Sequence, residues 1–471
     1  MHNQENFKIN DMACDVGNNH SAAHYMAREG NAMNEIRIET ETDEVSPVIQ
    51  EIDVIEKFNK KHAVVMVEGK FKVITEPQYG QSTKFSSLSD FHAFYQNDRI
   101  SEKMSASKYW CNSPDRRQYE GIGFFPDNSG PKEIYNQWQG FAVNPVEGDC
   151  SLYLNHISEV IADGDKNLNR YILAWMADAV QNPASKPGVA IVMLGDKGTG
   201  KGMFTKHFGA IFGNHFLEIT QKSQLVDKFN KHLQKTLMVF VDEAFLAGNK
   251  SADGPLKALI TEDNMMFELK NGDTYRARNH LRLIMATNND WAVPVGDKER
   301  RYLVLTIGKK HQQDHDYFGA IEKQMMQGGR EALMHYLLNL DISGINLRDV
   351  PKTKALFEQQ FNSMPPLQQF WWSKLNDGAG YTDNLSMSLR WRNWETEPVS
   401  IPTKELQKEF NEHFKRGRSL NPAQFGKDFR KVCPNVEKIK KVGEQTYLIP
   451  PLEECRKDFE KRIGYKSDWG S

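Results

Sequence analysis

The sequence predicts an α/β fold with a parallel sheet at its centre, and two observations support this prediction. A glycine-rich run at 195–202 stands between an apolar stretch at 189–194 and a plausible helix at 203–212. Two more apolar stretches, 237–241 and 281–287, each end in polar side chains. Continuous apolar runs of this length are typical of strands that are buried on both faces, as the strands of parallel sheets are. We therefore expect these three stretches to be core strands.

The 471 residues are enough for two or three domains. A net charge of −2 hides an uneven distribution of charge along the chain. Residues 1–56 carry twelve acidic residues against three basic ones, whereas residues 401–450 carry eleven basic residues against six acidic ones. A nearly neutral chain of this kind is compatible with a localised surface for nucleic acid.

The five cysteines are scattered, without a C-x-x-C pair, which argues against a zinc site and against a disulfide scaffold. No stretch approaches the roughly 20 apolar residues that span a bilayer. The first thirty residues also lack the apolar centre of a signal peptide. We expect a soluble, cytoplasmic protein without a membrane partner.

Residues 1–48 are rich in Asn, Glu, Asp and His, which predicts an acidic flexible tail. Residues 49–150 predict a small mixed α/β domain that begins with a helix and a hairpin. We find no paired-carboxylate strand motif of a primase–polymerase here, so a scaffold role is the preferred interpretation. Arg116 and Arg117 are expected to form surface salt bridges rather than to contact DNA.

The next predicted domain, 151–345, begins with helical patterns that suit either an oligomerising bundle or packing against the sheet. In the glycine-rich run, successive backbone N–H groups can turn toward phosphate oxygens, and Lys201 adds a point charge at a helix N-terminus. The run fits G-x-x-x-x-G-K-[ST], except that Gly202 replaces the hydroxyl residue that normally contacts Mg²⁺. Thr205, one helical turn later, is a weak substitute. The predicted nucleotide-binding residues are Gly195, Asp196, Lys197, Gly198, Thr199, Gly200, Lys201 and Gly202.

Polar side chains that follow the later strands complete this predicted site, because ligands bind at the carboxyl ends of parallel strands. Asp242 would hold Mg²⁺, and Glu243 would orient and polarise the attacking water. Asn288 would contact the γ-phosphate of ATP. Arg300 or Arg301, just before a fourth apolar run, could reach the γ-phosphate of a neighbouring subunit. Each residue alone has an ordinary explanation as a turn, cap or salt-bridge residue, but their order and spacing together favour nucleotide binding.

These motifs, in this order, resemble the superfamily 3 helicase module of phage and plasmid primase–helicase proteins. The resemblance is specific from about residue 155 to residue 340 and looser on either side. It implies a P-loop, AAA+-like ATPase core that uses ATP and Mg²⁺.

In that family, a hairpin between the acidic strand and the asparagine strand contacts DNA. Here the pair Asn271-Gly272 is a strong hairpin signal between alternating flanks. The resemblance implies DNA contacts from Lys270, Arg276 and Arg278 in the channel of a ring. An ordinary surface hairpin with solvated charges is the alternative.

Three segments follow the core. Residues 346–398 predict a helical linker, whose tryptophans are more often core residues than base-stacking ones. Residues 399–450 predict two helices and a hairpin about Gly443-Glu444, an arrangement that resembles a winged helix. Residues 451–471 predict a charged helix and a tail.

Basic side chains on the second of these helices and on the hairpin would face DNA if the segment is a DNA-binding winged helix. These predicted contacts are Lys427, Arg430, Lys431, Lys440 and Lys441. A winged helix that docks a protein is the alternative.

The resemblance as a whole implies an ATP-dependent DNA helicase that replicates a phage or mobile element in the cytoplasm of a bacterial host. We expect a hexameric ring that hydrolyses ATP between subunits and moves on single-stranded and forked DNA, with a separate primase or polymerase as a partner. Two alternatives stay open. One is a DNA-binding initiator or loader that ATP only switches, and the other is a nucleotide-binding scaffold that recruits a primase.

Overall fold

The computed structural model describes most of the chain from residue 47 onward. The described residues are 47–67, 69–76, 83–227, 229–243, 250–268, 274–296, 299–378, 391, 393–414 and 420–469. Nearly all of the predicted acidic tail at 1–48 lies outside them. Among the described residues, no helix is long and apolar enough to cross a bilayer. The same residues contain no group of three or more His, Cys, Asp or Glu side chains that could hold a metal ion.

The N-terminal domain packs short helices on a four-stranded sheet of order β3-β2-β1-β6. The predicted hairpin is β1 paired antiparallel with β2, and Trp110 is fully buried in the core beside it. Arg117 pairs with Glu76 at 2.7 Å, as expected. Arg116 forms no ion pair among the described residues, and its Nε donates to Oε1 of Gln118 at 3.2 Å. The helices are α1 (Pro47–Asn59), α2 (Leu88–Phe94) and α3 (Ala106–Asn112). The strands are β1 (His62–Val67), β2 (Lys70–Thr75), β3 (Lys84–Ser86), β4 (Arg99–Ser101), β5 (Met104–Ser105), β6 (Gln118–Tyr119), β7 (Gly121–Gly123) and β8 (Ile134–Asn136).

A five-stranded sheet forms the centre of the chain, and all of its strands run parallel. Its order is β10-β11-β14-β9-β15. Strand β9, which comes first along the chain, therefore lies between β14 and β15, which come last. The loop after β9 therefore stands where the strand order reverses, and open α/β sheets bind ligands at such a point. The strands are β9 (Ala190–Leu194), β10 (Phe216–Ile219), β11 (Met238–Val241), β14 (Arg282–Thr287) and β15 (Tyr302–Thr306).

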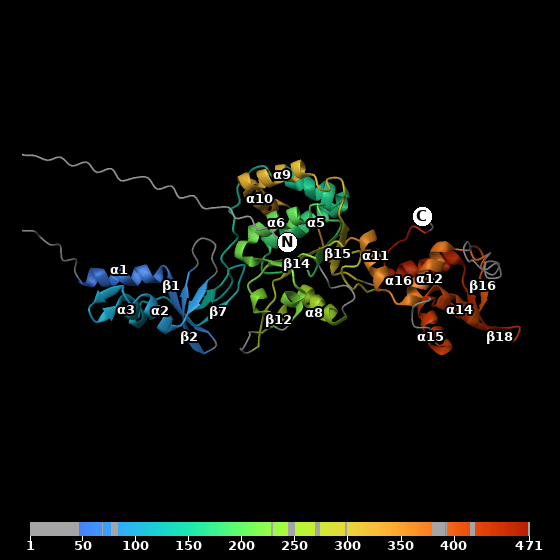
Figure 1. Ribbon diagram of the computed structural model, residues 1–471, viewed down its shortest axis with the longest axis horizontal. Helices are drawn as coiled ribbons and strands as arrows, with labels where there is room; N and C mark the ends of the chain where they lie inside the picture. The colour runs from blue at the N-terminus through green and yellow to red at the C-terminus, as the bar shows by residue number, and fades with distance from the viewer. Residues whose placement is uncertain are drawn as a thin grey trace, which may run out of the picture. The chain divides into compact units, whose positions relative to one another are not determined.

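Helices cover both faces of this sheet, with α5 and α6 on one face and α8 on the other (Figure 1). Along β9, Ile191 and Met193 enter the first core and Val192 the second, which explains why the strand is apolar throughout. The helices are α4 (Ser151–His156), α5 (Lys166–Gln181), α6 (Lys201–Phe212), α7 (Lys222–Val226), α8 (Lys250–Thr261), α9 (His315–Gln324) and α10 (Arg330–Asn339). Short helical turns lie at Ile157–Ile161, Gly213–His215, Lys231–Leu233 and Met325–Gly329, and β12 (Asn264–Phe267) pairs antiparallel with β13 (Tyr275–Arg278).

The C-terminal part contains a three-stranded antiparallel sheet of order β16-β18-β17. Two residues, Val442 and Gly443, join β17 to β18, and both have positive φ angles of 50° and 82°. The turn thus lies one residue earlier than we predicted. The strands are β16 (Val399–Pro402), β17 (Glu437–Lys441) and β18 (Glu444–Ile449), and the helices are α11 (Lys354–Ser363), α12 (Pro366–Asp377), α14 (Thr403–His413), α15 (Pro422–Val432) and α16 (Leu452–Ile463).

The segment that we expect to be a linker, 346–398, packs against two cores. Leu356 of α11 is buried in the core of the parallel sheet, whereas Trp371 of α12 is buried in the C-terminal core. Trp391 and Trp394 are buried in that same C-terminal core. These three tryptophans are therefore core residues and do not present their rings to a ligand.

Candidate nucleotide-binding site

The glycine-rich run forms a tight loop between β9 and α6, which we call the glycine loop (residues 195–202). Gly198 and Gly200 have φ angles of 78° and 98°, a left-handed conformation that side chains disfavour. A Cβ atom on Gly200 would also lie 2.4 Å from Cε1 of His156. Only glycine satisfies both conditions at this position, so the loop can pass directly over the buried imidazole and enter α6.

Lys201, the first residue of α6, is the cation of the site. Its side chain is 8% exposed, and its Nζ donates to the carbonyl oxygens of Gly195 at 2.5 Å and Asp196 at 2.8 Å. Nζ also donates to Oδ1 of Asn288 at 3.1 Å. Burial lowers the pKa of Lys201, while the carboxylates of Asp242 and Asp196 raise it. The ammonium group is thus held by neutral oxygens that a phosphate could replace.

The two acidic residues and the asparagine follow adjacent strands, β11 and β14, and the structure brings them to the glycine loop. A cavity of about 450 Å³ is lined by loop residues 197–202 together with Asp242, Glu243 and Asn288. Glu243 has a φ angle of 55°, and its N–H donates to Oδ1 of Asp242 at 3.1 Å. Such a backbone conformation costs about 1–3 kcal/mol for a residue with a side chain and is concentrated at functional sites.

Position 202, where the glycine-loop pattern normally has a hydroxyl residue, has free space around it. A Cβ atom on Gly202 would meet no atom within 4 Å. Thr205 does not supply the missing hydroxyl, because its Oγ1 is buried and donates to the carbonyl oxygens of Lys201 and Gly202, each at 3.2 Å. Thr205 is also absent from the residues that line the cavity. Asp242 therefore remains the expected metal ligand of this chain.

Sequence reasoning missed a segment that supports the glycine loop from outside, residues 309–318, which we call the bracing segment. The N–H of Gln313 donates to the carbonyl oxygen of Gly198 at 2.9 Å, and Lys309 pairs with Asp196 at 2.7 Å. Three of its residues, Gln313, His315 and Phe318, line the cavity. The segment follows β15 without a motif of its own, so only its position in the fold identifies it.

His156 of α4 supports the same loop from below. Its Nε2 lies 3.1 Å from the carbonyl oxygen of Gly200, and its Nδ1 lies 3.3 Å from the hydroxyl of Tyr317 in the bracing segment. The imidazole is fully buried, and this burial lowers its pKa to about 4. Neutral His156 therefore connects the loop to the bracing segment at physiological pH.

A second cavity of about 650 Å³ adjoins the first, because Asn288 lines both. One wall comes from the strand ends, including Asn289 and Ile307. The opposite wall is aromatic: the rings of Phe357 and Tyr465 stack with centroids 4.9 Å apart and an angle of 10° between their planes. Helix α11 and the residues after α16 thus reach the edge of the glycine loop.

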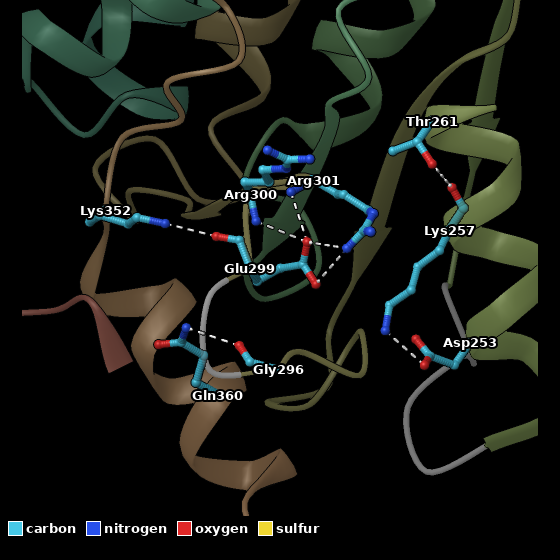
Figure 2. A network of polar contacts seen from close by, with 9 residues as sticks. All are labelled: Asp253, Lys257, Thr261, Gly296, Glu299, Arg300, Arg301, Lys352 and Gln360. Carbon is cyan, nitrogen blue, oxygen red and sulfur yellow. Dashed lines mark hydrogen bonds and ion pairs between the residues drawn. The ribbon is translucent and has the colours of Figure 1, made fainter. Parts of the chain in front are cut away.

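The two candidate arginines differ in their surroundings (Figure 2). Nη1 of Arg301 donates to the carboxylate of Glu299 at 3.2 Å. Glu299 is 3% exposed. Its carboxylate also accepts hydrogen bonds from the backbone N–H groups of Arg300 and Arg301, each at 2.9 Å. The guanidinium of Arg300 points away from this carboxylate, and within the described residues it has no hydrogen bond or ion pair. Arg300 is exposed and Arg301 is only partly exposed.

The predicted DNA contacts lie on exposed surfaces away from the cavity. Arg276 and Arg278 are exposed on β13, whereas Lys270 and the Asn271-Gly272 tip lie outside the described residues. In the C-terminal part, the predicted residues are all exposed, although Lys431 pairs with Asp428 at 2.8 Å. They are Lys427, Arg430 and Lys431 on α15, and Lys440 and Lys441 on β17.

Comparisons with known proteins agree with this central region. A family of unknown function, DUF5906, matches residues 193–301, which run from β9 through Arg301. A DNA primase-polymerase of Nitratiruptor phage NrS-1 is 23% identical over 256 residues, which are 53% of this chain and 34% of that protein. The match thus spans about a third of the relative's length.

Solved structures show that the fold is shared. The apo structure of the NrS-1 C-terminal region, residues 305–718, matches with a TM-score of 0.61 at 17% identity, and it covers 85% of this chain and 98% of that chain. An A form apo structure of the same region matches with a TM-score of 0.61 at 16% identity, and it covers 84% of this chain and 98% of that chain. This chain is therefore similar in sequence to a phage primase-polymerase and similar in fold to the NrS-1 C-terminal region.

Proposed function

We propose that this chain is an ATP-hydrolysing DNA motor of the superfamily 3 helicase type that acts in phage or mobile-element replication. One observation carries the proposal. A single cavity of about 450 Å³ gathers residues 197–202 of the glycine loop, including Lys201, with Asp242, Glu243 and Asn288 at the carboxyl edge of a parallel sheet. Each of these groups has a role in phosphoryl transfer, and three adjacent strands position them.

The residues present fit a nucleoside triphosphate with Mg²⁺. The first N–H groups of α6 have no partner within the helix and point toward the glycine loop, where they favour anions. The cavity lies within the range of about 300–1,000 Å³ that is typical of small-molecule sites. The adjoining cavity, with Phe357 and Tyr465 on its wall, offers an apolar surface for the nucleoside. Asp242 would hold Mg²⁺, which would offset the negative charge of the phosphates.

Glu243 would orient the attacking water and accept its proton. Its carboxylate is exposed at the cavity, and its strained backbone places it there next to Asp242. Asn288 would change partners, because its amide oxygen now accepts from Lys201 and would release the ammonium group toward a phosphate. Lys201 would then neutralise charge on the β- and γ-phosphates.

We assign the contribution from a neighbouring subunit to Arg300. Arg301 is paired within its own chain to a buried carboxylate, whereas the guanidinium of Arg300 is exposed. A cation supplied in trans needs a side chain that can leave its own surface, and Arg300 meets this condition. This assignment requires an assembled ring, which we expect to be a hexamer.

We propose DNA as the binding partner because this chain is similar to a protein that acts on DNA. The relative named above is a DNA primase-polymerase, and single-stranded or forked DNA would be the track for this motor. We propose that β12 and β13 carry the DNA-contacting hairpin into the channel. The C-terminal sheet with α14 and α15 would be a winged helix, with Lys427, Arg430 and Lys440 facing DNA. A separate primase or polymerase would act beside it.

The first test is ATP turnover by the purified full chain with forked DNA, followed by unwinding in the same sample. Glu243→Gln should keep nucleotide binding and lower turnover by about 10²–10⁴-fold, because the general base is lost. Glu218→Gln, an exposed glutamate on β10, is the matched control and should turn over ATP like the wild type. Wild-type turnover in Glu243→Gln would contradict the assignment of the base.

A second pair of variants tests binding. Lys201→Ala should abolish binding of a fluorescent ATP analogue, whereas Lys206→Ala, on the exposed side of α6, should bind it normally. DNA-stimulated turnover without unwinding would instead select the initiator or loader, and tight ATP binding without turnover would select the scaffold.

A further inference from the structure

A small basic recess lies in the N-terminal domain, outside every motif discussed above. It has a volume of about 200 Å³ and is formed by α2, the β4–β5 hairpin and α3. The polar side chains that line it are His92, Gln96, Arg99, Lys103, Ser105 and Lys108. We refer to this cavity as the basic recess.

The charge of the basic recess is positive and uncompensated. No carboxylate side chain is among the residues that line it. Arg99, Lys103 and Lys108 are exposed, and none of them forms an ion pair in the part of the chain that the structure describes. Two other cations of the same domain are paired, Lys57 with Asp98 at 3.5 Å and Arg117 with Glu76 at 2.7 Å. Three positive charges that line one recess without an anionic partner among the described residues favour an anion.

The recess is also held in shape by its own contacts. Nη1 of Arg99 donates to the carbonyl oxygen of Glu102 at 2.5 Å, which fixes the guanidinium over the hairpin turn. Nδ1 of His92 lies 3.1 Å from the hydroxyl of Ser107, so α2 is joined to α3 across the recess. Burial and then the charge of Lys108 lower the pKa of His92.

The size and the chemistry of the recess select a phosphate group. At about 200 Å³, it is smaller than the roughly 300–1,000 Å³ of typical small-molecule sites, so a whole mononucleotide is too large. A guanidinium fork, two ammonium groups, an amide and a hydroxyl match the oxygens of one phosphate. Because the cations are exposed, a chain attached to that phosphate can continue past the rim on both sides.

We propose that the basic recess binds a backbone phosphate of single-stranded nucleic acid. The N-terminal domain thereby holds the strand at a second place, apart from the contacts expected of the ATPase core. This proposal does not depend on ATP hydrolysis, so it stands or falls separately from the function proposed above.

The test uses the full chain with the double substitution Arg99→Ala/Lys108→Ala. The matched control is Lys61→Ala/Lys70→Ala, which removes two exposed lysines of the same domain that do not line the recess. Binding of a fluorescent oligo-dT is measured without nucleotide over a series of salt concentrations. Losing one phosphate contact should reduce the salt slope by about 0.7 and weaken binding about fivefold at 0.1 M salt. The control should keep the wild-type slope.

Two further measurements make the result decisive. Equal thermal midpoints of wild type and variant show that the fold is intact, and Lys103→Ala/Lys108→Ala replaces the variant if Arg99→Ala lowers the midpoint.

Phosphorus NMR line broadening with inorganic phosphate alone tests for a free anion site. A variant that loses this broadening but keeps the wild-type salt slope for oligo-dT overturns the proposal, and so does a variant unchanged in both. Normal DNA-free ATP turnover in a variant with a reduced slope supports it.

Discussion

At the scale of single residues, two glycines of the glycine loop have opposite requirements. Gly200 combines a left-handed backbone with a Cβ position 2.4 Å from the imidazole of His156. Gly202 is the second residue of α6, and a Cβ atom there would meet no atom within 4 Å. The loop therefore requires glycine at position 200, whereas position 202 has room for a side chain.

These two positions give a matched stability prediction. Gly200→Ala should destabilise the fold by about 1–3 kcal/mol from backbone strain and by about 1–3 kcal/mol more from overpacking. Gly202→Ala should be neutral or stabilise by up to about 1 kcal/mol, since alanine favours a helix over glycine. Thermal unfolding of both variants measures the difference. Equal midpoints would contradict the tight contact with His156.

Arg300 and Arg301 give a second prediction at this scale. Arg300→Ala should leave the thermal midpoint unchanged and lower DNA-stimulated ATP turnover by about 10³–10⁵-fold, as expected of a cation supplied in trans. Arg301→Ala should lower the midpoint, because it leaves the buried carboxylate of Glu299 without its cation at a cost of about 1–3 kcal/mol.

A mixing experiment separates action in trans from action within one chain. Neither Arg300→Ala nor Glu243→Gln should turn over ATP alone. Mixed rings should recover part of the activity, because a Glu243→Gln subunit supplies its Arg300 to a neighbour with an intact base. No recovery in mixed rings would argue that Arg300 acts within its own chain, or not at all.

At the scale of elements, the cavity next to the glycine loop joins helix α11 to the residues after α16. Phe357 and Tyr465 meet there as stacked rings. Both elements lie outside the parallel sheet, yet they line the same cavity as the strand ends. A nucleotide bound in this cavity would therefore contact the C-terminal part of the chain.

This arrangement predicts that Tyr465→Ala weakens binding of an ATP analogue by about 2–10-fold, the value expected for an aromatic contact of 0.5–1.5 kcal/mol. Tyr465→Phe keeps the ring and should bind like the wild type. Inorganic triphosphate, which has no base or sugar, should bind both variants equally. An equal loss for triphosphate would place the effect on the glycine loop rather than on a nucleoside site.

At the scale of the whole molecule, buried histidines such as His62 and His156 connect stability to pH. Burial lowers the pKa of His62 and of His156 to about 4 each. In the unfolded chain these groups titrate near the ordinary value of 6.5, so between about pH 4 and 6.5 the unfolded state binds more protons. Stability should therefore fall as the pH is lowered through this window, and it should be insensitive to these groups above it.

The thermal midpoint measured from pH 7.5 to 4.5 checks this expectation. His156→Gln should flatten the dependence by about one proton per molecule unfolded, even if it also lowers the midpoint at neutral pH. His335→Gln, a partly exposed histidine on α10, is the control for a change of net charge. A wild-type slope in His156→Gln would mean that His156 is not neutral in the folded protein.

Several features of the chain were predictable from sequence because they depend on local order. Apolar runs predicted the strands β9, β11, β14 and β15. Glycine spacing predicted the loop and a helix after it, although α6 begins at Lys201, two residues before the predicted start at Met203. Asp242, Glu243 and Asn288 were predictable because they end strands that must share one edge of a parallel sheet. The turn between β17 and β18 was predicted one residue late, since Val442 adopts a left-handed backbone that β-branched residues rarely adopt.

Other features depend on contacts between segments that are distant along the chain, and only the tertiary structure decides them. The bracing segment and His156 hold the glycine loop across more than forty residues of sequence, in an environment that no local pattern describes. The pairing of Arg301 rather than Arg300 with Glu299 depends on side-chain directions in an irregular loop. The aromatic wall from Phe357 and Tyr465 exists because two C-terminal elements pack beside the sheet. Sequence thus determined which chemical groups are present and in what order, whereas packing decided which of them meet, because burial and close contact are properties of the folded chain.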